Sequence, residues 1–295
     1  MRRYYMAAGI SKQGFHQYLN RKFVIREECE QLIPLITQIR KEYPTLSARE
    51  MYRIIQPKTL GRDRFERFCF EEGFKLERKR SFHKTTNSLG VTRFPNRIKG
   101  IELKGVNHVW VSDITYYRIK DRFYYLTFIT DQYSRKILGY SVSKDLFTEN
   151  TTIPALHMAL KQRNGHKPTI FHSDGGGQYY SKEFQLLTSP QILNSMGECA
   201  YENPLAERVN GLIKNDYLIH YGPRSFEDLL TQTARAVYNY NFKRHSALDT
   251  SPNVFEALST YEQQLTKEKK KQKKKKSIQI NNFVKSSELV NVIQA

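Results

Sequence analysis

The stretch VWVSDITYY at 109–117 opens a series of five strand-like segments that decides the fold prediction. It is rich in β-branched and aromatic residues, which favour strands. FYYLTFITD (123–131) and KILGYSVS (136–143) follow after short turns, as expected for an antiparallel meander. Two further short strands are predicted at TIFHSD (169–174) and QILNSM (191–196).

Helical patterns lie between and after the last strands. One begins at Thr148, a second lies near 181–188, and two more cover about 203–220 and 225–242. The order of three strands, helix, strand, helix, strand and helices predicts an α/β domain. We expect a ribonuclease-H-like mixed sheet with flanking helices, spanning residues 106–258.

A small all-α region is predicted for residues 1–80. Glu27 to Lys41 has helical apolar spacing, and Pro34 is expected to kink or split that helix. Ser47 caps a predicted helix through Ile55, and Arg62 to Glu72 forms another.

The segment AGIS at 8–11, followed by KQGFHQYL, resembles the turn and second helix of a helix-turn-helix. Such a helix offers its polar face to the major groove of DNA, although a purely structural turn fits the same letters. Residues 81–105 read as a basic linker. Residues 259–295 form a lysine-rich tail that we expect to be disordered.

The 295 residues carry a net charge of +19. The run 267–276 holds eight lysines and one glutamate, so +12 remains on the rest of the chain. Nucleic acid is the commonest polyanionic partner of such a chain, although a merely basic soluble protein has the same balance. We predict a cytoplasmic protein because no apolar run is long enough for a signal peptide or a membrane span. The cysteines, Cys29, Cys69 and Cys199, lack zinc-ligand spacing.

Two aspartates stand out on the predicted strands. Asp113 shares a strand face with Val111 and Thr115, where an unpaired charge is costly to bury. Asp174 ends a buried strand and runs into glycines 175–177, and open α/β sheets place their sites at such strand ends.

Helical spacing adds one glutamate, Glu207, to these two candidates. Asn203 suits an N-cap and Pro204 the first helical position. At about 100° per residue, the apolar stripe holds Leu205, Val209, Leu212 and Ile213, and the opposite face holds Glu207, Asn210, Gly211 and Lys214.

Each acid also has an ordinary structural interpretation. Asp113 could cap a turn or pair with an arginine, Asp174 could be an Asp-Gly turn residue, and Glu207 could be a first-turn acid favoured by the helix dipole. Taken together on this strand order, the three predict a catalytic triad.

Five ordered blocks carry a family resemblance: WVSDITYY (110–117), FITDQYSRKILGY (128–140), HSDGGGQYYS (172–181), YENPLAERVNGLIKND (201–216) and YNFKRHSALDTSP (240–252). The chain resembles orfB-type insertion-sequence transposases, whose core is related to retroviral integrases. The resemblance implies a DDE-type enzyme that cuts element ends and joins the freed 3′-hydroxyl to target DNA. It also implies a homo-oligomer on DNA, and fusion or association with an upstream helix-turn-helix protein.

The chain departs from the family pattern in the interval between Asp174 and Glu207. It has 32 intervening residues, where the family usually has a few more. The shortfall falls near 195–199. A shorter loop that still reaches the site and a decayed, inactive copy both fit this interval.

Oxygen ligands without a Cys/His cluster favour Mg²⁺, with Mn²⁺ as a substitute, over zinc. In a two-metal scheme, Asp113, Asp174 and Glu207 are the metal ligands. Candidate DNA contacts are Lys214, Arg208, Gln178, Arg62 and Arg64, and weaker candidates near the substrate are His172, Tyr179, Arg244 and His245.

Two other functions remain open. One is a catalytically inactive, integrase-like DNA-binding protein. The other is a ribonuclease-H-like nuclease that cuts hybrids or junctions, which the N-terminal helix-turn-helix prediction disfavours because transposition needs recognition of specific ends.

Overall fold

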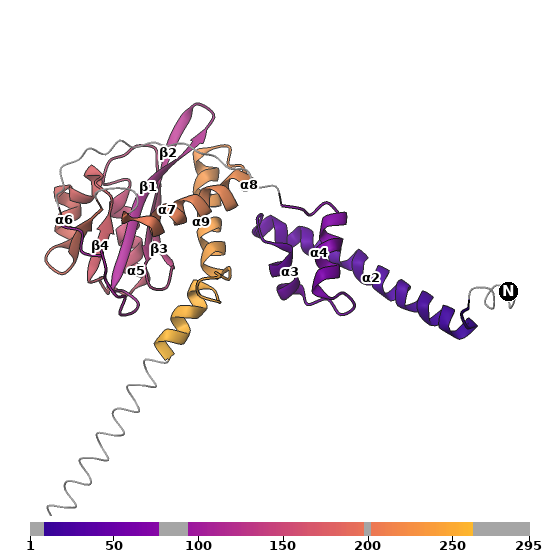
Figure 1. The fold of residues 1–295 in the computed structure, drawn as a ribbon. Helices are drawn as coiled ribbons and strands as arrows, with labels where there is room; N and C mark the ends of the chain where they lie inside the picture. Colours follow the sequence, from indigo (N-terminus) through magenta and orange to yellow (C-terminus); the bar gives the residue numbers. More distant parts are fainter. Residues whose placement is uncertain (1–8, 77–93, 198–201, 262–295) are drawn as a thin grey trace, which may run out of the picture.

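The computed structural model describes residues 9–76, 94–197 and 202–261. Within these ranges an all-helical N-terminal region lies beside an α/β domain (Figure 1). Half of the predicted linker and nearly all of the predicted lysine-rich tail lie outside the described residues.

The α/β domain is built on one mixed sheet of five strands: β1 (Val109–Ile119), β2 (Arg122–Asp131), β3 (Ile137–Ser143), β4 (Ile170–Ser173) and β5 (Leu193–Met196). Their order across the sheet is β3-β2-β1-β4-β5. The first three strands pair antiparallel, whereas β4 pairs parallel to both β1 and β5. This confirms the predicted ribonuclease-H-like sheet.

Helices cover both faces of the sheet, as predicted. The helices α5 (Thr152–Gln162) and α6 (Lys182–Thr188) share an apolar cluster with one face. The helices α7 (Pro204–Leu212) and α9 (Phe226–Phe242) share another with the opposite face. Between α7 and α9 lie a π-helical segment, η3 (Ile213–Leu218), and α8 (Ile219–Tyr221).

The helix α5 begins four residues later than predicted. Asp145 accepts hydrogen bonds from the Phe147 backbone N–H and from the Asn150 side chain, which closes a turn over the preceding residues. Gly139 lets β3 approach α5 closely, because a Cβ there would lie 2.1 Å from the Ala155 carbonyl oxygen.

The N-terminal region consists of α2 (Lys12–Glu42), α3 (Ala48–Ile55) and α4 (Arg62–Glu71). The two last helices match the prediction, and Ser47 caps α3 by accepting from the Glu50 N–H. The helices share a core formed by Leu32, Ile36, Leu46, Met51, Leu60, Phe65 and Cys69.

The prediction of separate short helices before residue 42 is wrong. Residues 12–42 form one helix of 31 residues, with Pro34 inside it. Leu32 and Ile36 are buried on either side of Pro34, so packing against α3 and α4 holds the helix across the lost backbone bond. Gly9 does adopt a positive φ of 64°, but Ala8 and everything before it lie outside the described residues. The helix-turn-helix therefore stays a prediction.

The end of α2 is fixed to the α/β domain. The Glu42 carboxylate pairs with Arg235 on α9 at 2.9 Å, and the Glu42 carbonyl accepts from the Tyr221 hydroxyl and the Asn239 amide. Arg244 adds an ion pair to Glu50 on α3 at 3.2 Å. Among the helices of the described ranges, none combines the length and apolarity needed to cross a bilayer.

Candidate active site

The strand register brings the two predicted aspartates together. β1 and β4 pair in parallel with Val111 opposite His172. Continuing that register by two residues sets Asp113 opposite Asp174, directly beyond the end of β4. Neighbouring strands lie about 4.8 Å apart, so the two half-buried carboxylates are near neighbours.

The pKa of Asp113 is raised to about 7. Burial is the main cause, and the negative charge of Asp174 adds to it, followed by that of Glu207. Burial also raises the pKa of Asp174. The aspartates therefore form a crowded acidic pair whose charge a cation would stabilise.

Backbone atoms hold the Asp174 carboxylate in place. The Gly176 N–H donates to Asp174 Oδ1 at 3.1 Å. A Cβ on Gly175 would lie 2.8 Å from Met196 Cε at the end of β5. The glycines after Asp174 thus permit the close packing that their position in the sequence predicts.

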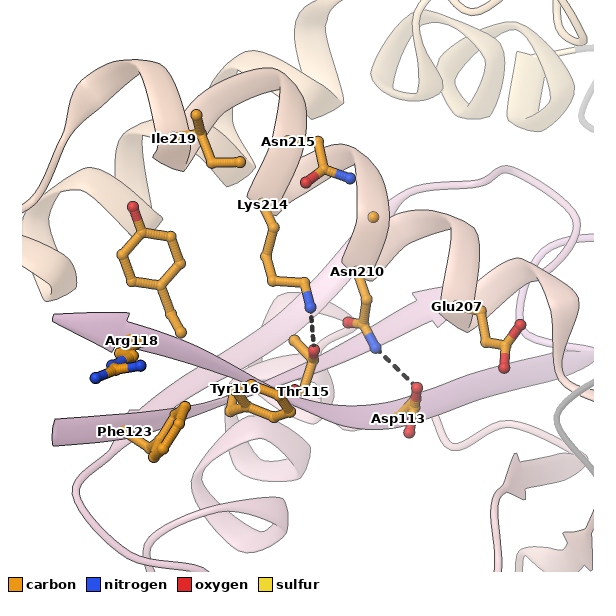
Figure 2. A pocket seen from close by; sticks show the side chains of 12 residues that line it. Asp113, Thr115, Tyr116, Arg118, Phe123, Glu207, Asn210, Lys214, Asn215 and Ile219 are labelled. Atoms are coloured by element: carbon orange, nitrogen blue, oxygen red, sulfur yellow. Dashed lines mark hydrogen bonds between the residues drawn. The ribbon is translucent and has the colours of Figure 1, made fainter. Parts of the chain in front are cut away.

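Three side chains attach the α7–η3 helix to β1. Asn203 donates to the Ser112 carbonyl at 2.9 Å, Asn210 to Asp113 Oδ2 at 2.8 Å, and the Lys214 ammonium to the Thr115 hydroxyl at 2.7 Å. Figure 2 shows the last two pointing from the helix onto the strand. These three hydrogen bonds fix the position of the helix along β1, the strand that carries Asp113.

The four residues predicted to share the polar face of this helix, Glu207, Asn210, Gly211 and Lys214, all line one cavity of about 570 Å³ together with Asp113. Glu207, however, is exposed, and its carboxylate points past Asp113 in Figure 2. Among the described residues, no three Asp, Glu, His or Cys side chains come close enough to hold one metal ion. The structure therefore pairs the aspartates and leaves Glu207 at the edge of the same cavity. Residues 198–201, which precede this helix, lie outside the described ranges.

His172 and Tyr179 are structural residues. His172 is buried, with one ring nitrogen bonded to the Ser195 hydroxyl and the other to the Glu202 carbonyl. Burial lowers the pKa of His172 to about 4, so the ring is neutral near pH 7. Tyr179 is also buried, and its hydroxyl forms a hydrogen bond with that of Ser112. Both support the strands beneath the aspartates.

The candidate DNA contacts fall in different places. Lys214 lies in the cavity, where burial lowers its pKa, and Gln178 donates to the Leu146 carbonyl. Arg208 is exposed on another flank of α7. Arg62 and Arg64 are exposed on α4, in the N-terminal region.

Sequence reasoning missed the supporting role of two asparagines. Asn203 was predicted as an N-cap, yet its side chain makes no cap bond and holds β1 instead. Asn210 was placed on the correct helix face, but its bond to Asp113 depends on how the helix crosses the strand. Helical spacing alone carries no such signal.

Comparison with known proteins adds the family. The model of the integrase core domain matches residues 104–196, which include both aspartates and end before Glu207. The chain is 28% identical over 265 residues to the insertion element IS600 31 kDa protein of Shigella sonnei, covering 84% of this chain and 95% of that protein. It is 33% identical over 162 residues to the transposase InsF of insertion sequence IS3A of Escherichia coli (strain K12), covering 52% of this chain and 54% of InsF.

The chain therefore contains an integrase core domain and is similar to insertion-sequence transposases. This core and this similarity support an enzyme of the DDE-type polynucleotidyl-transferase class, as the sequence predicted. Of the solved structures, the magnesium complex of the HTLV-2 integrase catalytic core domain (trimeric form) is 27% identical, with a TM-score of 0.42, and the match covers 51% of this chain and 96% of that one.

Proposed function

We propose that this transposase cuts the ends of its element and joins the freed 3′-hydroxyl to target DNA at the cavity beside Asp113. The observation that carries the proposal is the pairing of Asp113, inside β1, with Asp174, directly after the end of the adjacent β4, and the place of Glu207 on the wall of the cavity that Asp113 lines. A site of this kind suits phosphodiester chemistry, because it combines oxygen ligands for a cation with a nearby lysine.

The aspartate pair fits Mg²⁺ or Mn²⁺. Both groups offer hard oxygen ligands. Burial and the nearby charge of Asp174 raise the pKa of Asp113, and a divalent cation would stabilise the charged carboxylates against both effects. Glu207 would complete the ligand set, which requires its side chain to turn toward the aspartates. When bound, the metal supplies activation of the attacking oxygen and stabilisation of the leaving oxygen.

The chain's own residues orient the reacting groups. Asn210 occupies Asp113 Oδ2 and so fixes the direction of the other carboxylate oxygen. Thr115 holds the Lys214 ammonium on the cavity wall, where its charge attracts a phosphate.

Two displacements at phosphorus follow in this proposal. In the first, water attacks the phosphate at the element end, and the bond to the 3′ oxygen breaks to leave a 3′-hydroxyl. In the second, that hydroxyl attacks a target phosphodiester, and the 3′ oxygen of the target strand leaves. No covalent protein–DNA intermediate is needed.

The exposed position of Glu207 favours one competing candidate, a DNA-binding protein without catalysis. The assay uses the full chain with Mg²⁺ and DNA that carries the inverted repeats flanking its gene. Formation of both cut and joined products supports transposition. Binding without either product favours the inactive protein, and cleavage of RNA–DNA hybrids regardless of terminal sequence favours a nuclease.

The proposal extends to partners and place of action. A homo-oligomer is expected because two element ends must be joined in one event. Fusion or association with an upstream helix-turn-helix protein would add end recognition. We place the enzyme on the bacterial nucleoid, in the cytoplasm, where its DNA substrates lie.

A further inference from the structure

A second pocket lies on the other flank of α7. It has a volume of about 200 Å³, and its polar lining comes from the β2–β3 turn (Arg135), from α7 and η3 (Arg208, Asp216), and from the segment after α9 (Lys243, Arg244, His245). At about 100° per residue, Arg208 projects from α7 well away from Glu207 and Lys214, which line the catalytic cavity. One helix thus separates the two hollows.

Basic side chains outnumber acidic ones in this pocket. Lys243 has Asp216 at 4.0 Å, and Arg244 is paired with Glu50 and Asp249. Within the described part of the chain, no carboxylate lies within 4.0 Å of the Arg135 or Arg208 guanidinium groups. Two arginines therefore line this pocket without an ion-pair partner among the described residues, and Asp216 is its single lining carboxylate.

The basic side chains of the pocket are close enough to His245 to affect its pKa. The pKa of partly buried His245 is lowered, mainly by desolvation, while its bond to the Tyr240 carbonyl opposes that effect. The positive charges of Lys243, Arg208 and Arg135 lower it further. His245 therefore lies close to the basic side chains of Lys243, Arg208 and Arg135.

The fold fixes Arg135 in this place. The buried Asp131 carboxylate accepts from the Tyr133 and Ser134 N–H groups and closes the turn between β2 and β3. The turn holds Arg135 at a φ of 63°, a left-handed conformation that is uncommon for a residue with a side chain. Strained residues of this kind cluster at functional sites.

We propose that this basic pocket, formed by Arg135, Arg208, Lys243, Arg244 and His245, binds a backbone phosphate of the DNA substrate, outside the reacting step. The inference rests on the proposed function, since that function makes DNA the substrate. An α-helix with side chains is about 10–12 Å wide, so a phosphate bound on this flank of α7 is a different one from the phosphate that reacts beside Asp113.

The test measures binding alone, so it is independent of catalysis. The full chain is titrated with a short DNA duplex in EDTA at several salt concentrations. Substituting both arginines, R135Q with R208Q, is expected to weaken binding about tenfold at moderate salt and to lower the salt slope by about 1, the value for one lost phosphate contact. R208K keeps the charge and should bind nearly as well as the unchanged chain.

The control is R224Q, which removes one exposed arginine on the loop before α9, and it should change affinity less than twofold. An equal loss for R224Q would show diffuse attraction and overturn the proposal, as would unchanged binding by R135Q/R208Q. Displacement of the duplex by inorganic phosphate at constant ionic strength would assign the pocket to free phosphate instead.

Folding is checked by thermal unfolding. Since neither arginine has an ion-pair partner, R135Q/R208Q should unfold at the same temperature as the unchanged chain or slightly above it. If the double variant does not fold, R208Q alone decides, because Arg208 is exposed. If the chain does not transpose but its binding to the duplex still depends on Arg135 and Arg208, the proposed function is rejected and the phosphate site remains supported.

Discussion

The two halves of the candidate site are built in different ways. Asp113 and Asp174 lie on neighbouring strands, where the sheet register fixes their separation. Glu207 lies in the first turn of α7, a helix that is attached to the sheet by side chains. A sheet fixes the positions of its residues through backbone bonds, whereas a helix can shift against it at the cost of a few side-chain contacts.

This difference assigns separate tasks to the two halves. The aspartates form a site that can attract a cation before DNA arrives, because their charges are already close. Glu207 can complete that site only when its carboxylate turns toward them. Substitution of an aspartate should therefore weaken metal binding even without DNA, whereas substitution of Glu207 should mainly slow the reaction on DNA.

The largest effect is expected from the strand half. D113N or D174N should lower both cutting and joining by about 10³-fold or more, since loss of a metal ligand removes several kcal/mol of transition-state stabilisation. Duplex binding in EDTA should remain. The matched control is D121N, an exposed aspartate of the β1–β2 hairpin that should retain full activity. Activity in D113N above a tenth of that of the unchanged chain would contradict the assignment.

A smaller loss is expected from the helix half. E207Q should lower joining by about 10²-fold while leaving metal binding without DNA nearly unchanged, which isothermal titration with Mn²⁺ would measure. E227Q, another exposed first-turn glutamate, is the control and should act normally. If E207Q weakens metal binding without DNA as strongly as D113N does, the two halves act as one preformed site and the comparison fails.

The sequence was sufficient for the strand half and insufficient for the helix half. The residue types at 109–117 and 169–174 predicted both strands, with Asp113 inside the first and Asp174 at the end of the second, since period-two alternation and a glycine run are local signals. The polar face of α7 was also correct, because helical spacing is local. The direction of the Glu207 carboxylate and the bonds of Asn203 and Asn210 depend on the crossing of helix and strand, which local patterns do not encode. Likewise, Pro34 was expected to break a helix that packing keeps whole.

The free energy of unfolding should depend on pH through Asp113, which is buried beside Asp174. The pKa of Asp113 is about 7 in the fold against an ordinary 3.8, so the folded state binds the extra proton between these values. Protonated Asp113 therefore contributes to the stability of the fold below about pH 4, and this contribution is lost as the pH rises through about 7. D113N should remove this loss, so that in EDTA at pH 8 it is more stable than the unchanged chain by at most about 4 kcal/mol.

Two features make this measurement selective. Buried His172, whose pKa falls to about 4, acts in the opposite direction between pH 6.5 and 4, but it is common to both proteins and cancels in their difference. Mg²⁺ at pH 8 should raise the melting temperature of the unchanged chain and not that of D113N. Equal pH profiles for the two proteins would contradict the raised pKa of Asp113, and with it the burial of this carboxylate beside Asp174.

The smallest effect concerns the attachment of the helix. N203A removes the bond to the Ser112 carbonyl and should cost about 1 kcal/mol of stability. It should also slow joining several-fold without changing metal affinity, because the start of α7 is then less firmly placed. Denaturant unfolding and a single-turnover joining assay would measure the two effects. Unchanged joining despite lower stability would assign Asn203 to folding alone.

The most direct measurement is the anomalous scattering of Mn²⁺ in crystals of the full chain bound to an element-end duplex. We predict manganese beside Asp113 and Asp174, with the Glu207 carboxylate turned in from its exposed position to contact it. Manganese absent from the aspartates at saturating concentration would contradict the proposed active site. Manganese held by the aspartates with Glu207 still turned away would contradict its role as a ligand.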